Sequence, residues 1–353
     1  MAIYIVRKLA VALIVLAVAP SAALGAGGSG ADSVLSAQIK EADGVSGQDT
    51  NSGSGIKTGH IQDGAVTDSK ISGPISKSKL PSLANVVLVA KSGGDFTSIA
   101  AAIASVSPTD SSPVTIRVMP GTYDEGQTIY LKSNVTLQAD AAGTVTIHGP
   151  LNLFPLVQGV AVANVVVTGI TFDGGLHGMR MDDSSNVKIT TNIFRDFYNY
   201  GIVTFRSSVI VQNNFFTLTG ATMRGGIGIV TFNSVNVIKD NRFEGNFNVQ
   251  NSTGMGDAID DLGSQSLVVN NVFTDIAEGI SASKYNEVSS TETIIGNYFA
   301  NSFQSLSYPS DIGISESTAL ISNNVLMRGV ANQLSTVRGK FNSDLAGNEI
   351  VLP

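Results

Sequence analysis

Three carboxylates stand within five residues of this sequence, at Asp257, Asp260 and Asp261. Two carboxyl groups held close together can work as a general acid and a general base, and carboxylate oxygens are also ligands that Ca²⁺ prefers. We therefore predict Asp257, Asp260 and Asp261 as catalytic residues. Ca²⁺ is the cofactor that this pattern would suit, although no residue is assigned as a metal ligand. The alternative is that the three are solvated carboxylates of a loop.

Four cations suggest a different chemistry. An elimination reaction would need a cationic base in place of the carboxylate pair, and the candidates are Arg180, Arg206, Arg224 and Lys284. None of them belongs to a recognisable motif. The sequence therefore leaves the choice between hydrolysis and elimination open.

Two phenylalanines accompany these charges. We predict that Phe205 and Phe232 form a sugar-binding platform together with Arg180, Asp182 and Arg224, because aromatic rings offer a rigid apolar surface. The alternative is that both rings turn inward or lie beneath a loop. His177 is the only histidine of the repeats near this platform, and a lone histidine is more often structural or merely exposed.

A repeated phrase shows which elements must position these residues. An Asn, any residue and a large apolar residue recur at Asn192, Asn214, Asn241, Asn271, Asn297, Asn324 and Asn348. Successive copies are 22, 27, 30, 26, 27 and 24 residues apart, and a period of about 20 to 50 residues is typical of a solenoid or another repeat array. An apolar residue stands three positions before each Asn, and a small–apolar pair such as Gly201-Ile202 follows most copies.

Each repeat thus contains three short apolar pieces separated by turns, without room for an ordinary helix. This pattern predicts an all-β chain, a single-stranded parallel β-helix of about eight to ten coils in which equivalent side chains stack. The asparagines would form a hydrogen-bonded ladder and the phenylalanines an inner stack. Both columns would build the coil and perform no chemistry.

Alternation along the small–apolar pieces predicts the functional face. The apolar column should point inward, and it consists of Met179, Ile202, Ile229, Ile259 and Ile280. The next column should point outward, and it consists of Arg180, Val203, Val230, Asp260 and Ser281. The column two residues further on should also point outward, and it consists of Asp182, Phe205, Phe232, Leu262 and Ser283. Several of the segments that enter this face are long, and binding sites are commonly built on such loops.

The segment before the repeats should supply a cap. A short amphipathic helix is predicted from Thr97, as its N-cap, to about Val106, with Ile99 and Ile103 on its apolar face. Such a helix would cover the open end of the first coil, as terminal repeats require.

The same segment carries a family resemblance. The runs 94–103, 115–125 and 134–137 resemble the opening of pectin-lyase-like proteins, pectinesterases among them. Over residues 86–353 the resemblance implies a right-handed parallel β-helix, with the asparagine ladder between the second and third strands of each coil. It also implies that substrates bind on the outer face of the first strands. The catalytic motifs of pectinesterases are absent, so the resemblance does not imply esterase activity. Asp260-Asp261 is similar to the paired aspartates of polygalacturonases, which are inverting hydrolases, but their other motifs are absent.

Three segments precede the coil. Residues 1–25 have a positive start at Arg7 and Lys8, an apolar run and a small-x-small site ending at Gly25, which is typical of a secretory signal peptide, with an uncleaved anchor as the alternative. Residues 26–55 are predicted to be a flexible linker. Residues 56–85 resemble the stalk segments of bacterial surface proteins and phage fibres, and self-association through residues 56–80 is expected unless this stretch is an ordinary linker.

The composition limits the function further. The net charge of −7 makes the chain a poor general binder of nucleic acid, and the absence of cysteine excludes disulfides. We expect a protein secreted into the periplasm or the medium, or held at the cell surface, after cleavage near Gly25. It would bind a polysaccharide and, if the carboxylates or the cations are catalytic, cleave it as a hydrolase or a lyase. The alternative is a non-catalytic surface or extracellular protein, structural or adhesive, that displays a rigid β-helix, and the sequence does not decide between the two.

Overall fold

The computed structural model describes residues 85–151, 153–219, 226–247, 253–300, 311–327, 337–338 and 348–351. The predicted signal peptide, linker and self-associating stalk lie outside these residues, and so does Arg224. Within the described part of the chain, no helix is long and apolar enough to span a membrane.

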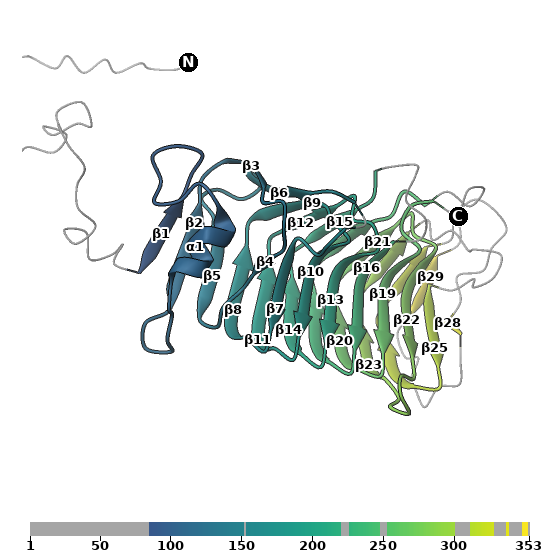
Figure 1. Cartoon of the computed structure of the whole chain (residues 1–353). Coiled ribbons are helices and arrows are strands. Elements are labelled where there is room, and N and C mark those ends of the chain that lie inside the picture. The colour runs from purple at the N-terminus through teal and green to yellow at the C-terminus, as the bar shows by residue number, and fades with distance from the viewer. Residues whose placement is uncertain are drawn as a thin grey trace, which may run out of the picture. The chain divides into compact units, whose positions relative to one another are not determined.

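Three parallel sheets wind around one axis and form a β-helix (Figure 1). Sheet A contains β1 Val86–Val89, β2 Val114–Val118, β5 Val135–Ala139, β8 Ala163–Thr168, β11 Ser185–Thr190, β14 Ser208–Gln212, β17 Val235–Lys239, β20 Gln265–Val269, β23 Thr291–Ile295 and β26 Thr318–Ser322. Sheet B contains β4 Ile129–Tyr130, β7 Val157–Val160, β10 His177–Asp182, β13 Tyr200–Phe205, β16 Ile227–Phe232, β19 Asp257–Leu262, β22 Glu278–Ser283, β25 Ile312–Ser315 and β28 Val337–Arg338. Sheet C contains β3 Gly121–Asp124, β6 Val145–Gly149, β9 Ile170–Gly174, β12 Ile193–Arg195, β15 Phe215–Thr217, β18 Arg242–Glu244, β21 Val272–Thr274, β24 Tyr298–Ala300, β27 Val325–Met327 and β29 Glu349–Val351.

Each repeat of the sequence is one coil with one strand in each sheet. The chain passes from sheet B to sheet A and then to sheet C, and the same order recurs from β4 through β27. The register aligns equivalent residues between coils: Met179 pairs with Ile202, Ile202 with Ile229, and Ile229 with Ile259. The predicted fold class and the predicted inward apolar column are therefore confirmed.

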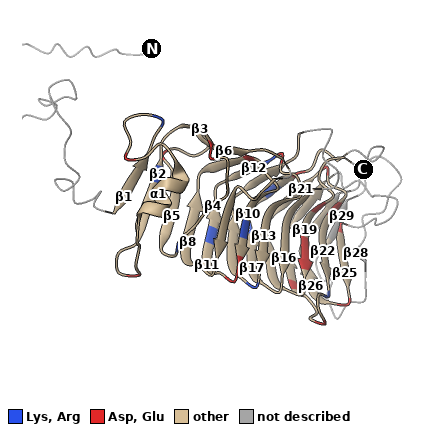
Figure 2. Ribbon diagram, in the orientation of Figure 1, with Lys and Arg blue, Asp and Glu red and all other residues tan. Residues whose placement is uncertain are grey.

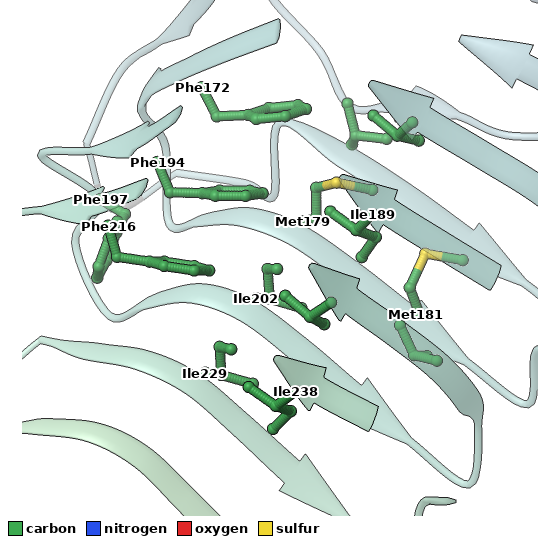
Figure 3. Close-up of a cluster of buried hydrophobic side chains, with 14 of the residues drawn as sticks. Phe172, Met179, Met181, Ile189, Phe194, Phe197, Ile202, Phe216, Ile229 and Ile238 are labelled. Carbon is green, nitrogen blue, oxygen red and sulfur yellow. The ribbon is translucent and has the colours of Figure 1, made fainter. Parts of the chain in front are cut away.

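The lumen of the coil is filled by the predicted apolar columns. Stacked rings follow sheet C at Phe172, Phe194, Phe216, Phe243, Phe273 and Phe299, with neighbouring centroids 4.6–5.1 Å apart. Figure 3 shows the first three rings lying parallel beside the isoleucines and methionines of sheets A and B. This stack explains the column of small residues in sheet B, since a Cβ atom at Gly201 would lie 2.9 Å from the ring of Phe216.

The asparagine ladder closes the turn between sheets A and C. Asn271 illustrates it: its Oδ1 accepts a hydrogen bond from the backbone N–H of Asn241 at 2.9 Å, and its Nδ2 donates to Ile238 O at 2.9 Å and to Asn297 Oδ1 at 3.0 Å. The residue before each ladder Asn has a left-handed backbone, from Thr191 (φ 59°) to Asn323 (φ 54°). Such a conformation favours Asn, Asp and Gly, which explains why Asn-Asn, Asp-Asn and Gly-Asn pairs recur here.

A second ladder, of serines, closes the turn between sheets B and A. It consists of Ser184, Ser207, Ser234, Ser264, Ser290 and Ser317. In each step the backbone N–H of one serine donates to the hydroxyl of the next at 2.9–3.2 Å. This column is hard to recognise in the sequence, because a single small polar residue leaves a weaker pattern than Asn followed by Phe.

The N-terminal helix is shorter than predicted. Helix α1 spans Ile99–Ser105, and its N-cap is Ser98, whose hydroxyl accepts from the N–H of Ala101, so the assignment of Thr97 as the cap is wrong by one residue. The carboxylate of Glu125 also receives the N–H of Ile99 at 2.6 Å, which explains why the helix begins there. Ile99, Ala102 and Ile103 are buried in the core of the first coils.

Candidate functional site

The outer face of sheet B carries most of the residues predicted to be functional. Figure 2 shows acidic residues on β19 and one basic residue on β10 of this sheet. The face divides along the axis into an ion-paired group on β7 and β10, an apolar stretch on β13 and β16, and an acidic group on β19 and β22.

The acidic group arises from a local break in alternation. Ala258 and Ile259 are both fully buried, because Ala258 occupies the small-residue column beside the ring stack and Ile259 the apolar column. Because these two successive side chains point into the coil, the side chains on either side of them, Asp257 and Asp260, both point outward. Both are half-buried. On the next coil Glu278 is the strand neighbour of Asp257, and Ser281 that of Asp260.

The two aspartates differ in their protonation. Burial, followed by the charges of Glu278 and Asp260, raises the pKa of Asp257 to about 8. Burial also raises the pKa of Asp260, but a hydrogen bond from Ser281 favours its charged form and limits the pKa to about 6. At pH 7 Asp257 is therefore mostly a carboxylic acid, whereas Asp260 is mostly a carboxylate. Two carboxyl groups whose environments separate their pKa values in this way are suited to acid and base roles.

Asp261 is placed inside the coil and not on this face. Its side chain is 0% exposed and belongs to the inward column of Thr204 and Thr231. Its carboxylate lies 3.1 Å from the hydroxyl of Ser290 and also bonds to the hydroxyl of Ser266. Because a substrate on the outer surface cannot reach it, the prediction of Asp261 as a residue that contacts substrate is corrected.

Arg180 and Asp182 lie together at the other end of the face. The Nε of Arg180 is 2.8 Å from Oδ2 of Asp182, and Nε2 of Gln158 donates to the same oxygen at 2.9 Å. Asp182 is only 8% exposed. Both predicted substrate-binding residues are thus engaged with each other, three coils away from Asp257 and Asp260.

The predicted aromatic platform is present and contains a third ring. Phe205 and Phe232 are half-buried neighbours with centroids 6.2 Å apart, and Tyr285 lies edge-on to Phe232 at 5.1 Å. The guanidinium of Arg206 lies over the ring of Phe205 at 4.2 Å and pairs with Asp183. The cluster of Phe232 and Tyr285 borders the acidic group, since Phe232 pairs with Leu262 of β19.

The side chains in the middle of the outer face of sheet B are buried and do not form an open surface. Val203 and Val230 belong to the outward column, as predicted, but they are 3% and 1% exposed. His177 is also buried, and its ring stacks on Tyr200 at 4.9 Å. Burial, with the nearby charge of Arg180, lowers the pKa of His177 to about 4, so this histidine is neutral at pH 7.

Like Arg180, two more of the cations proposed for elimination form ion pairs. Arg206 pairs with Asp183, and Nζ of Lys284 is 2.5 Å from a carboxylate oxygen of Glu287. Among the described residues, no group of three or more His, Asp and Glu side chains is arranged to hold a metal ion. The expectation of Ca²⁺ therefore has no ligand set on this face.

Glu278 and Tyr285 are the site residues that the sequence analysis missed. Glu278 stands before Gly279 as Asp257 stands before Ala258, so aligning the residue in front of each small–apolar pair would have found it. Tyr285 lies in a turn outside every repeated column, and no sequence signal indicates its contact with Phe232.

Comparison with known proteins agrees with this architecture. The family model described as "Right handed beta helix region" matches residues 157–243. An alginate lyase from Paenibacillus sp. superposes with a TM-score of 0.54 at 14% identity, over 75% of this chain and 95% of that one. The chain has a right-handed parallel β-helix fold.

Two further solved structures superpose less well on this chain. A family 28 exopolygalacturonase from Yersinia enterocolitica has a TM-score of 0.44 at 12% identity, over 75% of this chain and 65% of that one. A surface adhesin of Streptococcus pneumoniae has a TM-score of 0.37 at 14% identity, over 65% of this chain and 73% of that one. No curated protein matches the sequence. A fold alone does not identify a function, so the function must be argued from the site.

Proposed function

We propose that this protein binds a polysaccharide across the outer face of sheet B and hydrolyses it at Asp257 and Asp260. The observation that carries the proposal is the pair of half-buried carboxyl groups on β19, one with a pKa of about 8 and the other with a pKa of about 6. Such a pair holds one proton to donate and one charge to accept a proton at neutral pH.

The roles follow from the two environments. Asp257 donates its proton to the glycosidic oxygen as the bond to the leaving sugar breaks. Asp260, held in its charged form by the hydrogen bond from Ser281, takes a proton from the attacking water. Burial, followed by the negative charge of Glu278, keeps Asp257 protonated between turnovers.

The aromatic cluster supplies the sugar contact. Phe232 and Tyr285 form a half-buried edge-to-face pair beside β19, and the apolar face of a sugar can pack on such rings. Phe205 contributes less, because the Arg206 guanidinium lies over its ring. Phe232 and Tyr285 thus define a subsite next to the acidic group.

A depolymerisation screen of the purified chain tests the proposal. Neutral and acidic polysaccharides would be incubated with the protein, and new reducing ends would be read together with the absorbance of unsaturated uronates. Reducing ends without unsaturation support hydrolysis, and they should disappear in Asp257→Asn and Asp260→Asn. Asp173→Asn is the matched control, because Asp173 pairs with Arg195 on sheet C. Unsaturated products would overturn the hydrolytic assignment.

The second candidate is a non-catalytic protein that displays the coil for adhesion. The covered valines and the ion-paired Arg180 and Asp182 favour it, since much of the face is already satisfied. Binding of a polysaccharide without cleavage, by a protein shown to be folded by circular dichroism, would select this candidate. Export is part of both proposals, and a mature N-terminus near Gly25, found by sequencing the exported protein, would support it.

A further inference from the structure

Two buried carboxyl groups in the lumen behind β19 and β23 are not used by the proposed hydrolysis. Asp261 is 0% exposed and Glu292 is 2% exposed. They belong to adjacent sheets: Asp261 stands in the inward column of sheet B, and Glu292 in that of sheet A, where its strand neighbours are Ser266 and Ala319. Charged groups are almost never buried so completely unless their charge is compensated.

The two carboxyl groups differ in the hydrogen-bond donors around them. Asp261 is within hydrogen-bonding distance of the hydroxyls of Ser266 and Ser290, and it receives the backbone N–H of Ser264 at 3.2 Å. Neither carboxyl oxygen of Glu292 receives a hydrogen bond from an N–H or O–H group among the described residues. The group that Glu292 meets is the carboxyl of Asp261.

Two ionised carboxylates cannot hydrogen-bond to each other, but a carboxylic acid can donate to a carboxylate. The donors around Asp261 mark it as the charged member, and the absence of donors around Glu292 marks it as the protonated one. Burial, followed by the charge of Asp261, raises the pKa of Glu292 well above its ordinary value, which agrees with this assignment.

We propose that Glu292 and Asp261 hold one proton between them inside the coil, and that the resulting charge on Asp261 acts from within on Asp260. Asp260 and Asp261 are consecutive residues of β19 on opposite faces of the sheet. Asp261 would thus be a positioning residue for the outer site, and this second half of the proposal rests on the proposed function.

The described residues around Asp261 and Glu292 in the same inward columns carry no other titrating group. From β16, β17, β20, β22 and β26 the residues in these two inward columns are Thr231, Asn236, Ser266, Ala282 and Ala319, none of which titrates. The charge that acts on Glu292 is that of Asp261, and Asp261 adds to the pKa of Asp260. The chain of titrating groups therefore runs from Glu292 to Asp261 to Asp260.

Thermal unfolding as a function of pH tests the shared proton without any activity. The folded state retains a proton on Glu292 that the unfolded state releases above its ordinary pKa of 4.5. Stability from this group is thus complete below pH 4.5 and is lost as pH rises. Glu292→Gln keeps a donor for Asp261 and removes the titration. Between pH 5 and pH 8 the melting temperature of the native chain should fall by roughly 7 °C more than that of Glu292→Gln.

Thr204→Val is the matched control for this experiment. Thr204 is fully buried in the column of Asp261 but two coils away, and its hydroxyl contacts Asn236. This variant should lower the melting temperature equally at every pH. Equal slopes for the native chain and Glu292→Gln would overturn the shared proton. A melting temperature that chelators lower only when Glu292 is present would also overturn it, because a cation would then replace the proton.

The second half is read from the titration of Asp260. Its ¹³C carboxyl resonance is identified by its loss in Asp260→Asn, so that no substrate is needed. Asp261→Asn should lower the midpoint of Asp260 by roughly half a pH unit, whereas Glu292→Gln should leave it in place. If Asp261→Asn does not fold, the Asp261→Asn/Glu292→Gln pair, which is neutral and can hydrogen-bond internally, replaces it. An unchanged midpoint would overturn the coupling.

Both experiments, the melting curves and the titration of Asp260, still test the proposal if the activity screen finds no cleavage. The melting curves and the carboxyl titration measure proton binding in the folded chain, so they can support the internal pair even if no polysaccharide is cleaved. If cleavage is found, the acidic limb of the pH–rate profile should move with the midpoint of Asp260 in Asp261→Asn. A limb that stays in place while the midpoint moves would mean that Asp260 is not the base.

Discussion

At the scale of single residues, protonation decides what the acidic group can do. If Asp260 must be charged and Asp257 neutral, cleavage should rise through about pH 6 and fall through about pH 8. The measurement is kcat/KM across this range on whichever polysaccharide is cleaved. Asp257→Asn and Asp260→Asn should each lower the rate by roughly 10²–10⁴-fold, while Asp173→Asn leaves it unchanged. A rate that is flat between pH 5 and pH 9 would contradict these roles.

The stereochemistry of the product distinguishes Asp260 from Glu278 as the partner of Asp257. Asp260 is three residues along the strand from Asp257, a rise of about 10 Å, whereas Glu278 is the lateral neighbour, about 4.8 Å away between strands. Inverting hydrolases separate their carboxyl groups by roughly 6.5–9.5 Å and retaining ones by about 5 Å. The backbone rise of about 10 Å lies just above the inverting range and far from the retaining one. We expect inversion, measured by ¹H NMR of the first product anomers. Retention would instead identify Glu278 as a nucleophile.

The same residues show how far the sequence leads at this scale. Asp257 and Asp260 could be recognised from their spacing, and alternation from Ile259 already implies that Asp261 turns inward. The break that turns Asp257 outward could not be foreseen, because it depends on the phenylalanine stack that fills the space beside Ala258. The protonation of each carboxyl group depends on neighbours from other coils, which no local motif contains.

At the scale of elements, the turns hold the coil through two ladders of different strength. Asn214 is 3% exposed, and its side chain accepts from the N–H of Asn192 and donates to Ile189 O and to Asn241 Oδ1. Ser207, in the preceding turn of the same coil, accepts the N–H of Ser184 and offers one donor. Removing Asn214 therefore leaves more buried groups unsatisfied than removing Ser207 does.

This difference predicts an order of stability. Asn214→Ala should cost about 3 kcal/mol or more, since at least two buried groups lose their partners, and Ser207→Ala about 1–2 kcal/mol. Ser208→Ala is the control, because Ser208 is exposed on β14 and should change stability by less than about 0.5 kcal/mol. Melting temperatures measured by circular dichroism would check the order. Equal losses in Asn214→Ala and Ser207→Ala would contradict it.

The two ladders also differ in how readily the repeat pattern of the sequence predicts them. The asparagine ladder and the phenylalanine stack were predictable because each unit pairs two unusual residues at a fixed distance. The serine ladder repeats as regularly in space, but its residues are common, and the turn after Ser283 is longer than the others. Glu292 lies two residues before Ile294 in the inward column of sheet A, so alternation predicts its burial but not its partner.

At the scale of the whole molecule, charge selects the substrate class. The chain has a net charge of −7, and three cations on or beside the outer face of sheet B each pair with a carboxylate, namely Arg180, Arg206 and Lys284. An anionic polymer would meet the carboxyl groups of β19 and β22 without a free cation among these three to compensate it. We therefore predict that a neutral polysaccharide binds more tightly than a polyuronate of the same length.

Affinity electrophoresis in native gels that contain each polymer measures this preference, with the salt concentration varied. Retardation by the neutral polymer should be insensitive to salt, and retardation by the polyuronate should be weak at every concentration. Asp182→Asn removes the partner that Arg180 holds at 2.8 Å, so it should increase retention by the polyuronate at low salt and leave the neutral polymer unaffected. Strong, salt-sensitive binding of the polyuronate by the native chain would mean that cations outside the described face govern recognition.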